Sequence, residues 1–143
     1  MKLEHLLQAY KINNIDTEVK NMSDKKEKAG VITFADGISA SYLLDNEDIV
    51  IAMKIFFNCL ARNNSKPQAQ INHVIKVLNV IQQTIMLLGN ITQKETNMIL
   101  EKLGLFDNTF RGGKQIKHLE HAYKIEVIDG LLCLSINEIR YEE

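Results

Sequence analysis

Residues 124–136 read KIEVIDGLLCLSI, and residues 31–43 read VITFADGISASYL. In both stretches apolar residues alternate on either side of an Asp-Gly pair, which begins at Asp129 in one and at Asp36 in the other. Alternation with a period of two is typical of a half-buried strand, and Asp-Gly favours a hairpin turn because that turn needs positive φ twice. The two stretches therefore predict two β-hairpins, which we expect to complete one antiparallel sheet.

The residues between the hairpins predict helices that pack on this sheet. Asp45 has the character of an N-cap for an apolar helix that ends near Arg62. A second helix over 67–88 follows a Ser cap and has a Pro in its first turn. The sequence Thr-Gln-Lys-Glu at 92–95 is a capping box for a third helix, which ends at Leu103 before a terminating glycine.

The two ends of the chain add less regular elements. Residues 1–12 predict a short amphipathic helix and 13–29 a polar linker, so that 1–30 form an arm and 31–143 a single domain. A short helix is expected over 114–122. The fold class predicted is α+β, with a helical core of three to four helices packed on an antiparallel sheet made from two Asp-Gly β-hairpins.

Composition excludes several classes of protein. The chain has 143 residues, a net charge of −1 and 45% apolar residues, an ordinary globular mixture with no basic excess for a nucleic acid. The longest apolar run, Ile49 to Met53, is too short for a membrane span. Cys59 and Cys133 both have apolar neighbours, as reduced core thiols do. With no secretory signal at the N-terminus, we expect a cytoplasmic protein.

No motif predicts an enzyme, a cofactor or a metal. His118 and His121 would share a helical face, with His5, His73 or Glu120 as a third ligand, but the spacing is not that of HExxH and surface histidines are the simpler interpretation. The apolar surroundings of Cys59 do not favour a reactive thiol. The sequence Arg-Gly-Gly-Lys at 111–114 lacks both glycine patterns of phosphate-binding loops.

The helix over 67–88 carries more apolar surface than one core can enclose. Lys76 is its only formal charge, and the helix over 46–62 is almost as apolar. Two such helices strain the surface-to-volume ratio of a chain this size, so part of the apolar face is a candidate interface with a protein partner or a second copy. The predicted interface residues have heptad spacing or lie beside it: Ile71, Val74, Leu78, Ile81, Ile85 and Met86.

We therefore expect a small non-enzymatic protein–protein interaction protein of the adaptor, chaperone, inhibitor or immunity type, working as a homo-oligomer. The alternative is a winged-helix-like DNA-binding regulator, because three helices before a hairpin follow that element order. Its contact residues would be Arg111, Lys114, Lys117 and His118. The nine residues before its third helix are too many for the usual turn, so this alternative ranks second. A metal protein or enzyme centred on the two histidines ranks third.

Overall fold

The structure, a computed structural model, describes residues 1–21, 28–34, 37–58, 67–106 and 114–139. Helices and strands alternate in blocks along these residues, which makes the fold α+β. The elements are α1 (Leu3–Ile12), β1 (Glu18–Asn21), β2 (Lys28–Thr33), β3 (Ser39–Leu44), β4 (Val50–Phe57), α2 (Pro67–Gly89), α3 (Gln93–Leu103), β5 (Gln115–His118), β6 (His121–Ile128) and β7 (Leu131–Glu138).

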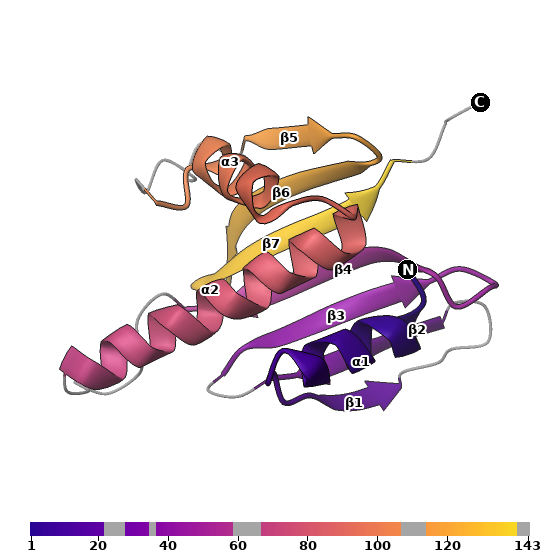
Figure 1. Ribbon diagram of the computed structural model, residues 1–143, viewed down its shortest axis with the longest axis horizontal. Helices are drawn as coiled ribbons and strands as arrows, with labels where there is room; N and C mark the ends of the chain where they lie inside the picture. Colours follow the sequence, from indigo (N-terminus) through magenta and orange to yellow (C-terminus); the bar gives the residue numbers. More distant parts are fainter. Residues whose placement is uncertain (22–27, 35–36, 59–66, 107–113, 140–143) are drawn as a thin grey trace.

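All seven strands form one antiparallel sheet in the order β1-β2-β3-β4-β7-β6-β5. The first four strands and the last three join where β4 pairs with β7, so the N-terminal and C-terminal parts of the chain meet in the middle of the sheet. The three described helices lie on one face of the sheet, which we call the inner face (Figure 1). The sheet therefore has more strands than the two predicted hairpins supply.

The core lies between the helices and the inner face. Alternate residues of the central strands point into it, among them Ile32, Ile55 and Leu134, which are fully buried. The residues between them belong to the outer face, where Val31, Ser41, Lys54, Ser135 and Lys124 lie opposite one another in register across five strands. An antiparallel sheet packed on one side gives this alternation in β2 and β4, whereas Cys133 and Ser135 on the outer face of the central strand β7 are buried as well.

Helix α1 belongs to the core. Leu6 and Tyr10 are fully buried, and the Tyr10 hydroxyl hydrogen-bonds to Thr84 Oγ1 on α2. The Tyr10 ring also packs edge-on against Phe34, with ring centroids 5.3 Å apart. The predicted amphipathic helix is therefore present, whereas the linker predicted over 13–29 is wrong where it includes β1 and the start of β2, because both belong to the sheet.

The predicted helices over 67–88 and 93–103 are present as α2 and α3. The capping box of α3 is complete: Thr92 Oγ1 accepts from the Glu95 backbone N–H at 3.1 Å, and the Glu95 carboxylate accepts from the Thr92 N–H at 3.5 Å. Gly104 ends this helix with φ at 84°, the left-handed conformation that glycine adopts without strain. Two local signals thus fix the ends of α3.

Two other predicted helices are wrong. Residues 45–62 contain β4, which pairs with β3 and β7 in the middle of the sheet. Asp45 does accept backbone N–H groups, from Glu47 at 2.8 Å and Ile49 at 3.0 Å, but it closes a turn between strands instead of capping a helix. Residues 114–122 contain β5 and the turn into β6. Arg62 and Cys59 lie outside the described residues.

The turn between β6 and β7 has the backbone that a two-residue hairpin requires. Asp129 and Gly130 have φ values of 52° and 78°. Ile128 and Leu131 on either side of them form the last pair of the ladder. Gly37, between β2 and β3, also has φ at 78°, while Asp36 lies outside the described residues.

Candidate interaction surface

The apolar stripe predicted on α2 divides into two halves with different exposure. Ile71 and Val74, in the N-terminal half, are 53% and 38% exposed. Ile81 and Ile85, in the C-terminal half, are fully buried within the chain itself and face no partner. Leu78 and Met86 are half-buried. Only the N-terminal part of the predicted interface is available for binding, and we call Ile71, Val74, Ile75 and Leu78 the α2 stripe.

Neighbouring helices account for this division. The chain turns back after α2 through a short connection, so α3 lies beside its C-terminal half, where Gln82 Nε2 donates to Asn97 Oδ1 at 2.9 Å. Helix α1 contacts the same half through Tyr10 and Thr84. Figure 1 shows the N-terminal half of α2 extending beyond the ends of the strands, away from both helices.

The N-terminal half is nevertheless held to the body along its other side. His73 is 6% exposed, and its Nε2 lies 2.7 Å from the Asn58 backbone carbonyl at the end of β4. Val77, one turn later, is also buried. Because these residues follow the buried side of the helix, Ile71 and Ile75 are turned outward, and Ile75 is 58% exposed.

The α2 stripe has no charge of its own. Lys76 is the only formal charge in the helix, and its position lies off the stripe. Among the described helices, α2 is also long and apolar enough to cross a membrane by length and composition alone. The C-terminal half of α2 lies in the protein core, and a core helix has the same apolar composition as a membrane-spanning helix.

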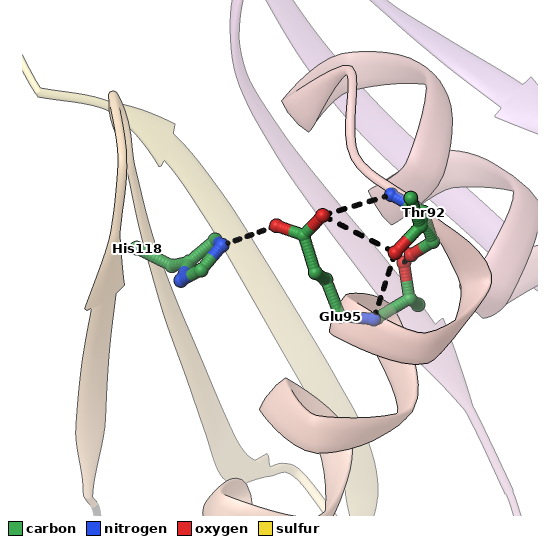
Figure 2. A network of polar contacts seen from close by, with 4 residues as sticks. Thr92, Glu95 and His118 are labelled. Atoms are coloured by element: carbon green, nitrogen blue, oxygen red, sulfur yellow. Dashed lines mark hydrogen bonds and ion pairs between the residues drawn. The ribbon is translucent and has the colours of Figure 1, made fainter.

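A polar junction fixes the other side of α3. The Glu95 carboxylate closes the capping box and also contacts His118 of β5, with Oε2 2.8 Å from His118 Nε2 (Figure 2). The hydrogen bond to His118, followed by those to Thr92, lowers the pKa of Glu95. One carboxylate therefore joins the start of α3 to the edge of the sheet. The capping box was visible in the sequence, but its link to His118 depends on the sheet order.

Burial shifts the pKa of three titratable groups in β6 and β7. Tyr123 is fully buried, and burial, together with the nearby Glu95 charge, raises its pKa to about 12. Its hydroxyl has no hydrogen-bond partner among the described residues. Burial lowers the pKa of His121. Burial also raises the pKa of the Cys133 thiol, which opposes its use as a nucleophile.

The residues predicted to contact nucleic acid do not form one helical surface. Lys114 and Lys117 are exposed, but Lys117 lies in β5 and not on a recognition helix. His118 contacts Glu95, and Arg111 lies outside the described residues. The two histidines weighed as metal ligands form a cross-strand pair beside a turn, His118 opposite His121. No group of three or more potential ligands occurs within the described parts of the chain.

Two hollows occur away from α2. One, of about 400 Å³, lies between the start of α1 and the ends of β2 and β3, where Lys28 Nζ and Asp48 Oδ1 are 2.7 Å apart. The other, of about 420 Å³, is an open depression on the sheet between Val31, Leu43 and Lys54. The α2 stripe differs from both hollows, because it gathers exposed apolar side chains along one helix.

The chain was compared with known protein families, curated proteins and solved structures, and none of these comparisons found a match.

Proposed function

We propose that this chain is a small non-enzymatic protein–protein interaction protein and that its α2 stripe binds an amphipathic helix of a partner protein. The observation that carries the proposal is the contrast within α2. Ile71 and Ile85 occupy the same heptad position of one helix, yet the first is 53% exposed and the second is fully buried.

The fold itself suggests what kind of element covers the stripe. On the C-terminal half, the cover is α3, a helix of 11 residues and about 16 Å. The stripe continues the same spacing of three and four residues, which is the surface that another helix fits by side-chain interdigitation. Since the stripe is uncharged, apolar contact supplies the affinity, and the partner helix needs no particular charge.

The test uses methyl NMR of the full chain and a defined probe, a synthetic peptide with the sequence of residues 92–104. This peptide carries α3, the helix that covers the equivalent surface. We expect the methyl signals of Ile71, Val74 and Ile75 to shift during the titration, while that of Ile85 stays in place. The Ile75→Glu variant should lose the shifts because it places a charge in the apolar contact.

Asn72→Glu is the matched control, because it adds the same charge to an exposed position of the same helix half, off the stripe. Its carboxylate can still accept from Gln68 Nε2, which donates to Asn72 Oδ1 at 3.2 Å in the native chain. Shifts of the stripe that depend on protein concentration, without peptide, would identify a second copy's α2 as the bound helix. An absence of shifts, or shifts at Ile81 and Ile85 alone, would refute a helix-binding stripe.

A further inference from the structure

The first strand of the sheet has an unpaired edge. β1 lies at one end of the sheet order, so its only strand partner among the described residues is β2. All four of its residues, Glu-Val-Lys-Asn at 18–21, are exposed. The backbone N–H and C=O groups of an edge strand are available to pair with another strand.

The two charges of β1 lie on the outer face and lack charged neighbours on the strand beside them. Glu18 lies opposite Thr33, and Lys20 lies opposite Val31. Val19 lies opposite Ile32 and is therefore on the inner face, where it is 36% exposed. Both the charges and the valine are available to a strand that adds to this edge.

The sequence of β1 is complementary to a second copy of itself in an antiparallel pair. When two copies of β1 pair antiparallel about a two-fold axis at Val19, Glu18 of each copy faces Lys20 of the other, and the two Val19 side chains face each other. Opposite charges and apolar residues directly across an antiparallel pair are stabilising, while like charges are destabilising. The two-fold axis is perpendicular to the sheet, so the helices of both copies remain on the same side.

The opposite edge of the sheet does not have this property. β5 reads Gln-Ile-Lys-His at 115–118, and Lys117 is the only side chain in it that carries a fixed charge. No two-fold register of β5 places opposite charges against each other. One register places the two Lys117 side chains together, and His118 already contacts Glu95.

From these observations we infer that the chain forms a two-fold homodimer through β1, in which two seven-stranded sheets join into one. The contact is short, about 14 Å for four residues of strand, so the dimer is weak and concentration-dependent. This inference does not depend on the α2 stripe. A dimer joined at β1 leaves both stripes free and so offers two copies of that surface to partners.

Charge reversal provides the test, because the strand is exposed and its substitutions leave the core intact. Glu18→Lys places two lysines opposite each other at both charge pairs of the dimer, and Lys20→Glu places two glutamates opposite each other at the same pairs. We expect each single variant to weaken dimerisation at least about ten-fold, as measured by sedimentation equilibrium from micromolar to millimolar concentration. The double variant, which exchanges the two charges, should restore the native dimer.

The sharpest result comes from mixing the two single variants. Each position 18 then faces an opposite charge at position 20 of the other variant, so the mixture should form a heterodimer more strongly than either variant forms a homodimer. Circular dichroism of each variant checks that the fold is retained, and Ile75→Glu should leave the dimer unchanged. A wild-type chain that stays monomeric, or single variants that dimerise as wild type does, would overturn the inference. A dimer that survives both reversals but is lost in Ile75→Glu would assign self-association to the α2 stripe instead.

Discussion

The two halves of α2 have the same kind of sequence and different surroundings. Ile71 and Ile85 are two heptads apart on one helix, so the local spacing gives them the same role. α3 and α1 contact the C-terminal half, and Ile85 is fully buried there, whereas Ile71 is more than half exposed. The comparison shows that an apolar stripe fixes which side of a helix can be buried, while the length of the neighbouring elements fixes how much of it is buried.

The largest effect should come from testing the two isoleucines directly. Ile85→Ala removes a fully buried side chain and leaves a cavity, so we expect the free energy of unfolding to fall by about 2–5 kcal/mol. Ile71→Ala removes an exposed side chain at the same heptad position and should change the free energy of unfolding by less than about 0.5 kcal/mol. Urea unfolding followed by circular dichroism measures both.

Equal losses in the two variants would mean that the N-terminal half of α2 is also core and that the α2 stripe is not a free surface. The full chain must be compared at one low protein concentration, because any self-association adds to apparent stability.

The elements with strong local signals were predictable from sequence. α3 has a capping box at Thr92 and a glycine at its end, and each acts within one turn of the helix. α2 has a long apolar periodicity that only a helix satisfies. Both helices therefore begin and end within about one residue of the prediction.

The wrong helices lack such signals. β4 is a run of eight residues, mostly apolar, and short apolar runs do not distinguish a central strand from a buried helix. Its abundance of isoleucine, valine and phenylalanine favours a strand, but Asp45 before it resembles a cap. For β5, Ile116 and Leu119 have helical spacing, while pairing with β6 decides the structure. That pairing closes a hairpin at Leu119 and Glu120, where Leu119 has a φ of 53°, and neither residue type signals such a turn in the sequence.

The candidate site was also predictable only in part: the sequence indicated its apolar face but not the exposed portion of that face. The sequence placed Ile71, Val74 and Leu78 on one apolar face with Ile81 and Ile85. It could not separate the exposed from the buried part, because the covering helices include one that is distant in sequence: Tyr10 lies 74 residues from its partner Thr84. The exposed part of α2 is set by where α1 and α3 pack against it, and this follows only from the three-dimensional structure.

The second prediction concerns the contact that joins α1 to the buried half of α2. Thr84 Oγ1 donates to the Val80 carbonyl and accepts from the Tyr10 hydroxyl, which is buried. Thr84→Val should lower the free energy of unfolding by about 1–3 kcal/mol, since the Tyr10 hydroxyl then has no partner. Tyr10→Phe should cost less because the bond from Thr84 to Val80 remains.

A double-mutant cycle separates this bond from packing. The double variant Tyr10→Phe/Thr84→Val should be less destabilised than the sum of the two singles, because it leaves no buried hydroxyl without a partner. Additive losses would show that the two side chains contribute through packing alone, and that this hydroxyl pair does not distinguish the two halves of α2.

The third prediction concerns the N-cap of the covering helix. Thr92→Ala removes the acceptor of the Glu95 backbone N–H, and we expect a loss of about 1 kcal/mol in the free energy of unfolding. Native-state hydrogen exchange should show the loss as faster exchange in α3 and in the C-terminal half of α2, with no change in its N-terminal half. Equally faster exchange in both halves would mean that α3 supports the whole helix.

The smallest expected effect is the pH dependence of the same junction. The hydrogen bond with His118 lowers the pKa of Glu95 in the folded chain below its ordinary value of 4.5. The unfolded chain therefore binds a proton first as the pH falls, so the stability that this carboxylate adds is complete above pH 4.5 and is lost below it. Glu95→Gln should flatten the fall of unfolding free energy in that acid range.

Glu101→Gln is the matched control for this last prediction, since Glu101 is an exposed glutamate on the same helix. It should leave the acid dependence as it is in the wild type, because among the described contacts its carboxylate closes no cap and reaches no strand. If Glu95→Gln and Glu101→Gln behave alike between about pH 3 and pH 5, a range set by the ordinary carboxyl pKa, the Glu95–His118 contact adds no acid-dependent stability. The cover over the C-terminal half of α2 would then depend on apolar packing and the Thr92 cap, and the difference between its two halves would be independent of pH.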